Sequence, residues 1–315
     1  MTNTNPAPHD VLVHYTDAQG LEGILRSNTL WATHGGHTND AEELQTGLRI
    51  LERFYATEFG SDIDFRIIKE ISIEQAATWQ KYIFSLSETK EGESYIQKNG
   101  RLSQWRAYGD YGIVFNKKEL VDIVPIIKRR KKTAYAWGLD PVLYCDPAEQ
   151  IHRETKVYDL LLDYVKKFKQ VFLPQSPNTY PPDNDAAKPV LEAFIKILFL
   201  IKNKGFEEEK EHRLYIGYYD QETINQFYCN QGKKSTHFQN EHYEGITIRR
   251  NRIVPYINLF KNDPLPIEKI LIGPAPDEEQ KKREAGVNAL IKHLKSIGSL
   301  KNDIPVHCSA IPYRG

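Results

Sequence analysis

Residues 11–32 limit the fold of this chain more than any other stretch, because they change from apolar to polar and back to apolar. The run Val11–Val13 predicts a short strand that ends at His14 and Tyr15. An amphipathic helix is predicted next, and the apolar residues Leu30–Ala32 predict a second strand. An imidazole and a phenol at a strand end, beside a helix N-terminus, can receive a sugar and an anion. The same residues can also form an ordinary buried His-Tyr pair that satisfies its own hydrogen bonds.

Polar residues mark both ends of the helix in this stretch. Thr16 or Asp17 is suited to cap its N-terminus, because a short side chain with an oxygen can accept a hydrogen bond from a free backbone N–H. Asn28 and Thr29 are expected to end it. The buried stripe is predicted at Leu21, Ile24 and Leu25.

Predicted strands lie toward both ends of the chain, and most predicted helices lie between them. Further strands are predicted at residues 82–87, 113–115, 121–127, 142–145, 212–219, 245–248, 253–260, 267–272 and 305–308. Further helices are predicted at residues 44–60, 63–79, 102–108, 151–172, 191–202 and 277–297. This pattern favours one α+β domain over residues 11–315, with a helical insertion around 148–204. We expect residues 1–10 to be disordered and residues 88–100 and 173–189 to form loops.

Composition and charge narrow the class of protein. The chain has 315 residues, is 40% hydrophobic, and balances 42 Lys and Arg against 42 Asp and Glu. A net charge of zero gives no overall attraction to nucleic acid or membrane, so such affinity would need a local patch. The polar first ten residues and the lack of an apolar run of about 18 residues argue against a signal peptide and a membrane span. Three widely separated cysteines suggest reduced thiols, so we expect a cytoplasmic protein with no membrane partner.

Short motifs along the chain are shared with a known enzyme superfamily. His14-Tyr15-Thr16, followed by a Gly-Leu-x-x-Ile-Leu helix and a short strand, resembles the first motif of the ADP-ribosyltransferases. It is especially similar to the opening of bacterial DNA-modifying ADP-ribosyltransferase toxins. The whole chain also resembles a large bacterial family of largely uncharacterised proteins. The other residues that carry this second resemblance are Asn39-Asp40 with Glu43, Phe84-Ser85-Leu86-Ser87, Leu102-Ser103-Gln104-Trp105-Arg106 with Tyr108-Gly109, Glu209-Lys210-Glu211-His212-Arg213, Ile272-Gly273-Pro274 and Ile311-Pro312-Tyr313-Arg314.

The resemblance implies an ADP-ribosyltransferase-like fold, with mixed, mainly antiparallel sheets around a cleft and with helical insertions. It also implies that the cleft binds NAD as a substrate, without a metal. Arg106 would steady the phosphates or the catalytic carboxylate, because a guanidinium has a fixed charge and binds in a bidentate manner. A surface ion pair is the simpler role for Arg106. The residues that the resemblance assigns to dinucleotide binding are His14, Tyr15, Thr16, Ser85, Ser87, Tyr108 and Arg213.

Glu211 is the residue that the resemblance assigns to the chemistry at the ribose. Cleavage of the nicotinamide bond builds an oxocarbenium-like centre, which a nearby carboxylate can stabilise. Strand alternation places residues 211, 213 and 215 on one face, and the apolar Leu214 and Ile216 predict that the opposite face meets the core. Glu209 shares the parity of Glu211 but lies in a Glu-rich run that we expect to be solvated. Which of the two glutamates acts stays open, and without the resemblance a solvated acidic run is the simpler interpretation of both.

These expectations lead to one favoured function and two alternatives. The favoured function is NAD-dependent ADP-ribosyl transfer to an unidentified, macromolecular acceptor, and the analogy with toxins suggests a role as a toxin or in phage defence. The first alternative is NAD hydrolysis, in which water replaces the acceptor. The second is a non-catalytic nucleic-acid-binding or regulatory module, which two basic clusters would serve: Lys128–Lys132 and Arg249–Arg252. Each cluster alone is more typical of a solvated edge.

Overall fold

The description of the fold rests on a computed structural model of the chain. It describes residues 9–35, 43–60, 80–130, 134–172, 184–218, 244–249, 252–260 and 264–312. The predicted helix at 63–79 lies outside these ranges, as do most of residues 1–10 and of the loop at 173–189. His9 and Asp10 are described, and the Asp10 carboxylate accepts a hydrogen bond of 3.0 Å from the backbone N–H of Glu91.

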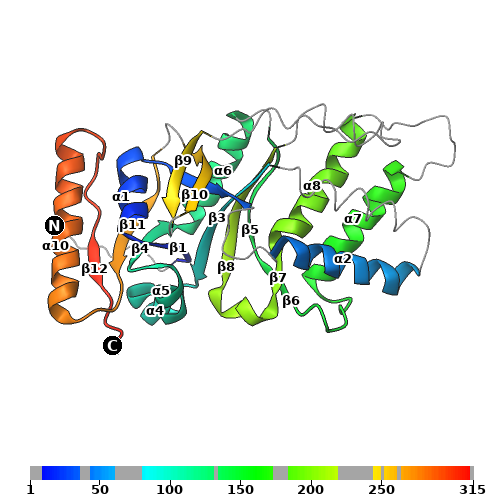
Figure 1. The fold of residues 1–315 in the computed structure, drawn as a ribbon, viewed down its shortest axis with the longest axis horizontal. Coiled ribbons are helices and arrows are strands. Elements are labelled where there is room, and N and C mark those ends of the chain that lie inside the picture. Colours follow the sequence, from blue (N-terminus) through cyan, green and yellow to red (C-terminus); the bar gives the residue numbers. More distant parts are fainter. Residues whose placement is uncertain are drawn as a thin grey trace.

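One large sheet, mostly antiparallel, forms the centre of the molecule (Figure 1). The strands of its main path follow the order β12-β11-β4-β1-β3-β2-β10-β9, and β8 joins β3 to β5 at the side of that path. Only β11 and β12 pair in parallel among the described strands of this sheet. The strands are β1 (Val11–Thr16), β2 (Leu30–His34), β3 (Gln80–Thr89), β4 (Tyr111–Asn116), β5 (Ala134–Pro141), β8 (Glu211–Tyr218), β9 (Gly245–Arg249), β10 (Arg252–Leu259), β11 (Ile267–Ile272) and β12 (Val306–Cys308). The fold is therefore mixed, with a mainly antiparallel open sheet, as expected from the α+β pattern.

Helices cover both ends of this sheet (Figure 1). α10 (Asp277–Ser296) lies at one end beside β11 and β12. At the other end, α2 (Glu43–Phe59), α7 (Lys156–Phe172) and α8 (Asn184–Leu200) pack together beside β5 and β8. The shorter elements are α1 (Ala18–Ser27), α4 (Ser94–Asn99), α5 (Leu102–Tyr108), α6 (Lys117–Arg130), the 3₁₀ helix η3 (Lys204–Glu209) and a small parallel sheet of β6 (Leu143–Cys145) and β7 (Ile201–Asn203).

A change of partner along β3 opens the sheet between β1 and β3. The end of β3 pairs with β1 through Ser87–Thr89, whereas Tyr82 and Ile83 pair with β2. Between these two ladders, Phe84–Leu86 have no ladder partner on this side within the described strands, although β8 pairs with them on the other side. A gap in a sheet leaves backbone groups that need other partners. This gap is where the side chains of β1 and β8 can meet.

Side-chain alternation divides the core into three clusters. On one face of β8, Leu214 and Ile216 join the main core together with residues from β1, β3, β4 and α10. On the other face, Tyr215 belongs to the core of α2, α7 and α8. Val13 and Tyr15 form a third, smaller cluster with Trp105 of α5. The face that carries residues 211, 213 and 215 is therefore covered by two separate apolar clusters.

Several sequence predictions of local structure are wrong. Residues 121–127 lie in α6 and not in a strand, since Leu120 and Val124, four positions apart, are buried while Val121 is exposed. Residues 94–99 form α4 within the predicted loop at 88–100. The strand β5 was not predicted, and α8 begins at Asn184, so it includes six residues assigned to the loop, Pro189 among them.

Candidate functional site

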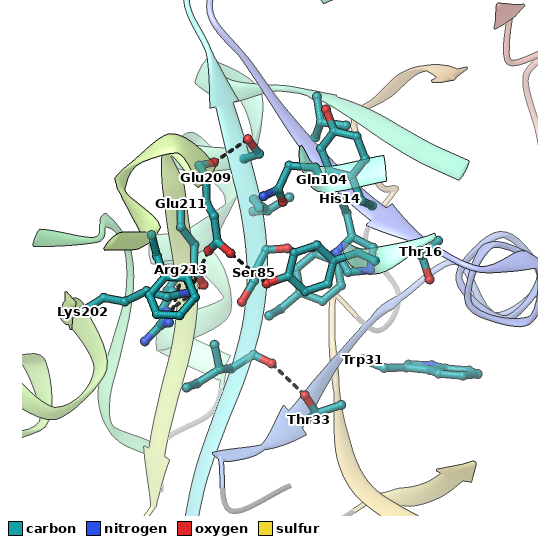
Figure 2. Close-up of a pocket in the computed structure, with 18 of the residues that line it drawn as sticks. His14, Thr16, Trp31, Thr33, Ser85, Gln104, Lys202, Glu209, Glu211 and Arg213 are labelled. Atoms are coloured by element: carbon teal, nitrogen blue, oxygen red, sulfur yellow. Dashed lines mark hydrogen bonds and ion pairs between the residues drawn. The ribbon is translucent and has the colours of Figure 1, made fainter. Parts of the chain in front are cut away.

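A cavity of about 780 Å³ lies at the opening between β1 and β3 (Figure 2). Its size is within the range of roughly 300–1,000 Å³ that is typical of cofactor and small-molecule sites. Residues from β1, β2, α2, β3, α5, β7, η3, β8 and β10 surround it, together with Asp17 at the N-cap of α1. The side chains that line it include Val13, His14, Tyr15, Thr16, Asp17, Trp31, Thr33, Arg49, Ser85, Ser87, Gln104, Tyr108, Lys202, Phe206, Glu209, Glu211, Arg213, Arg252 and Val254.

His14 lies where β1 leaves β3. Its Nδ1 atom is 2.9 Å from the carbonyl oxygen of Ser85, so Nδ1 carries a proton and donates it to a carbonyl that the gap in the sheet leaves without a ladder partner. The ring stacks on Phe84, with 4.1 Å between the ring centroids. These two contacts fix the orientation of the imidazole at the cavity wall.

Tyr15 also lines the cavity, and its hydroxyl is bound to the backbone outside it. The phenol oxygen accepts a hydrogen bond of 2.8 Å from the backbone N–H of Arg101, and the ring packs edge-on against Trp105. Burial raises the pKa of Tyr15 to about 12, against the opposing effect of the Arg101 contacts. Tyr15 is therefore a neutral, fixed wall of the cavity at physiological pH.

The N-terminus of α1 adjoins this wall. Of the two predicted caps, Thr16 and Asp17, Asp17 is the N-cap, and its carboxylate accepts a hydrogen bond of 2.8 Å from the backbone N–H of Gly20. The side chains of Thr16 and Asp17 both line the cavity. Asp17 already places a negative charge at this helix end. The N-terminus of α1 would therefore attract an anionic ligand group less strongly.

α5 approaches β1 closely enough to add Tyr108 to the site. Gly109, which follows α5, has a φ of 136°, and a Cβ atom there would lie 2.5 Å from the carbonyl oxygen of Thr16. Only glycine permits both that conformation and that approach. The hydroxyl of Tyr108 then donates a hydrogen bond of 3.1 Å to Glu209, and burial together with the Glu209 carboxylate raises the pKa of Tyr108.

The opposite wall carries four charged side chains that contact one another: Lys202, Glu209, Glu211 and Arg213 (Figure 2). We call them the site cluster. Arg213 holds Glu211 in a fork, with Nε 2.7 Å from Oε1 and a terminal nitrogen 3.0 Å from Oε2. Lys202 lies 2.7 Å from Glu209 and 3.0 Å from Glu211. All four residues are buried, so their charges are neutralised by one another and not by solvent.

Glu211 is held in its ionised form. Burial opposes ionisation, but the charges of Arg213 and Lys202 and hydrogen bonds from Arg213 and Ser85 outweigh it and lower the pKa of Glu211 to about 2. The backbone N–H of Glu211 donates a hydrogen bond of 2.8 Å to the hydroxyl of Tyr144, whose pKa is raised to about 12 by burial and the nearby carboxylates. A fully ionised carboxylate at the cavity wall can stabilise a positive charge that develops in a bound ligand.

The two serines of β3 have different positions. Ser85 pairs with Arg213 in the sheet, is exposed to the cavity, and hydrogen-bonds the Glu211 carboxylate. Ser87 pairs with Glu211 but is buried, and its hydroxyl donates a hydrogen bond of 2.7 Å to the carbonyl oxygen of Glu209. Ser85 is therefore available to a ligand, whereas Ser87 anchors η3 to β3.

The predicted meeting of His14, Arg106 and Glu211 in one cleft is wrong for Arg106. His14 and Glu211 line the cavity, but Arg106 is exposed and does not line it. On α5, Gln104 and Tyr108 are four positions apart and face the cavity together, whereas a residue two positions from each lies on the other side of the helix.

Three other sequence expectations about this wall need correction. Glu209 is not solvated, because it is buried at the end of η3 and bound to Lys202 and Tyr108. Tyr215 has the predicted parity, but α8 covers it and its hydroxyl donates to Asp140. Lys202 was not predicted as a site residue, although a lysine directly after the apolar run 197–201 is a signal that could have found it.

The predicted basic clusters are described only in part. Lys131 and Lys132 of the first cluster and Arg250 and Asn251 of the second lie outside the described residues. Arg252 lines the cavity. Among the described residues, no three His, Cys, Asp or Glu side chains gather closely enough to hold a metal ion. The helices of the described ranges include none with the length and apolar character needed to cross a membrane.

Comparison with known proteins gives one match. Residues 104–214 match the model of a family described as "Protein of unknown function (DUF2971)". The match covers less than half of the chain, and it includes the site cluster and Tyr108 but not β1. No curated protein and no solved structure matches the chain. These comparisons indicate no function, so a proposal about function must be argued from the geometry of the site.

Proposed function

We propose that this protein is an ADP-ribosyltransferase that binds NAD in the cavity between β1 and β8 and transfers ADP-ribose to a macromolecular acceptor. The observation that carries the proposal is that His14 and Glu211, which are far apart in sequence, line the same cavity on strands that flank β3. These two residues belong to the motifs that resemble the ADP-ribosyltransferases. The resemblance and the geometry therefore support each other.

The cavity walls suit the two parts of such a substrate. His14 and Tyr15 form a rigid aromatic wall, against which the flat nicotinamide and its ribose can lie. Asp17 at the start of α1 would disfavour a phosphate there, so the pyrophosphate would lie nearer Arg49 and Arg252, which also line the cavity.

In this proposal Glu211 provides negative charge beside the ribose carbon that loses nicotinamide. The neutral leaving group departs with the bonding electrons, and positive charge develops on the sugar. Glu211 is ionised at every physiological pH because its pKa is about 2, so it needs no proton transfer before it acts. Ser85, which hydrogen-bonds Glu211 on the cavity side, would hold the carboxylate toward the sugar.

The decisive experiment is to incubate the protein with NAD and measure nicotinamide release. We expect the variant Glu211→Gln to release nicotinamide at least about 100-fold more slowly, because it keeps the volume and loses the charge. Glu209→Gln is expected to be milder, since Glu209 contacts Tyr108 instead of Ser85. A labelled acceptor distinguishes transfer from hydrolysis.

Arg106→Ala is the matched control for this experiment. Arg106 is an exposed charge outside the cavity, so we expect unchanged nicotinamide release and unchanged stability. Absence of nicotinamide release from the folded protein, with NAD and with nucleic-acid and protein acceptors, would contradict the proposed enzyme. Equal effects of Glu211→Gln and Arg106→Ala would contradict the assigned site.

A further inference from the structure

Lys202 comes to the site from the helical part of the chain. It lies on β7, directly after α8, and only 4% of it is exposed. Its ammonium lies 4.8 Å from the centre of the Phe206 ring, which covers it from the η3 side. A lysine in such a position keeps its charge only where anionic partners compensate for the lost hydration.

Those partners are the two glutamates of the cavity wall. The Nζ atom of Lys202 is 2.7 Å from Oε2 of Glu209 and 3.0 Å from Oε2 of Glu211. Because both oxygens contact the same nitrogen, the two carboxylates are close neighbours. The fork of Arg213 reaches Glu211, and its remaining terminal nitrogen donates to the carbonyl oxygen of Phe199 at 2.6 Å. Lys202 is thus a cation that contacts both carboxylates at once.

We infer that Lys202 is a positioning residue, whose ammonium holds Glu209 and Glu211 side by side as two negative charges at the cavity wall. Two adjacent carboxylates without a cation between them share a proton, and one of them titrates at a higher pH. A glutamate that is protonated would provide less negative charge to a ligand. The helical insertion therefore contributes an electrostatic part of the site as well as a cover for the sheet.

The other groups around the pair explain why Lys202 has a separate role. Arg213 from β8 remains beside Glu211 when Lys202 is removed. Tyr108 from α5 and Tyr144 from β6 stay neutral, since their pKa values are raised, and they add no charge. Glu209 would then keep a hydrogen bond from Tyr108 but lose its cation. The change on removal of Lys202 should therefore fall mainly on Glu209.

The test measures the titration of the glutamates directly. The protein is labelled with ¹³C at glutamate side chains, the signals are assigned with Glu209→Gln and Glu211→Gln, and carboxyl shifts are followed from pH 3 to 8. In Lys202→Met we expect the midpoint of Glu209 to move upward by at least about one pH unit. Lys202→Arg should restore most of the original midpoint, because a guanidinium also contacts two carboxylates.

Lys204→Met is the matched control. Lys204 is only two residues away and pairs with Glu149 at 3.4 Å on the surface, so its loss should leave the midpoints of Glu209 and Glu211 unchanged. If Lys202→Met does not fold, the double variant Lys202→Met/Glu209→Gln removes the like-charge contact and should fold. Failure of this double variant too would show that Lys202 acts through packing and would overturn the proposal, as would unchanged midpoints in folded Lys202→Met.

The titration is independent of catalysis, although the proposed role of the charges rests on the proposed function. If the wild-type protein releases nicotinamide, Lys202→Met should show a pH–rate profile displaced to higher pH, while Lys204→Met keeps the wild-type profile. A shifted Glu209 midpoint without nicotinamide release from wild type would reject the enzyme and keep the role of Lys202. Nicotinamide release with an unaltered profile in Lys202→Met would reject the role of Lys202 and keep the enzyme.

Discussion

The β3–β8 strand pair carries two charge clusters on its opposite faces, and they differ in how they are neutralised. The site cluster lies on the face of Glu211 and Arg213, where all four members are buried. The second group, which we call the outer cluster, consists of Asp10, Glu88, Lys90 and Lys117. It lies on the face of His212, whose Nε2 is 3.9 Å from Glu88.

Ion pairs of the same kind contribute differently in the two clusters, because only one cluster is exposed to solvent. In the outer cluster, Lys90 lies 2.6 Å from Glu88 and 3.2 Å from Asp10, and its side chain is 57% exposed. Water and salt screen such pairs, so each contributes little. In the site cluster, burial has removed the water, so each charge depends on its protein partners. A costly buried cluster beside a cavity is more typical of a functional site than of a stabilising device.

The largest effect should come from removing one charge of the site cluster. Arg213→Met leaves Glu211 buried without its bidentate partner, so we expect the free energy of unfolding to fall by about 3–5 kcal/mol. Urea denaturation monitored by circular dichroism measures this change. A loss below about 1 kcal/mol would show that the site cluster behaves like the outer one.

The second-largest difference between the two clusters should appear in how acid lowers the stability of the protein. Glu211 has a folded-state pKa of about 2, below the ordinary value of 4.5, so its stabilisation is complete above about pH 4.5 and is lost as the pH falls toward 2. Glu211→Gln should therefore flatten the fall in the urea midpoint between pH 5 and 3. Lys117 and Lys90 also lower the pKa of Glu88 despite its partial burial, so Glu88→Gln should flatten the fall in the same direction but less. A larger effect of Glu88→Gln than of Glu211→Gln would contradict the expected difference between the two clusters.

The smallest effect is expected in the outer cluster. Lys117→Met should lower the free energy of unfolding by no more than about 1 kcal/mol, because Lys90 still contacts Glu88 and solvent reaches the pair. The difference from wild type should shrink further when salt is raised to 1 M, where the screening length is about 3 Å. Denaturation at low and high salt measures both effects. Arg213→Met should keep its loss at high salt, since its partner is buried.

Local periodicity predicted much of the fold but not all of it. The strand that carries His14, a cap at Thr16 or Asp17 and the helix α10 were predicted close to their observed bounds, because each depends on residues near one another in sequence. The prediction that His14 lies at the end of its strand is wrong, because β1 continues to Thr16 in its pairing with β4. Residues 121–127 were misassigned, since an apolar run in the middle of a helix resembles a strand when only its composition is considered. β5 was missed because pairing with β8 forms it despite a weak apolar pattern.

In the candidate site, too, some features could be predicted from local sequence and others could not. Alternation placed Glu211 and Arg213 on one face, and this prediction needs only the two-residue repeat of a strand. It could not show that α8 would cover Tyr215 or that Glu209 would be buried beside Lys202. Likewise, the Leu102–Tyr108 motif contains both Arg106 and Tyr108, and only the orientation of α5 decides which of them reaches the cavity.

The sequence by itself determined the elements with a clear local pattern, such as β1, α1 and α10, the faces of the strands and the residue types available for chemistry. These properties follow from backbone geometry and local capping, which act over a few residues. The tertiary structure decided that β3 leaves β1 for β2, that Lys202 bridges two glutamates, and that Arg106 stays outside the cavity. These outcomes depend on contacts between segments far apart in the chain, and no local pattern encodes which distant strand or helix will supply the partner.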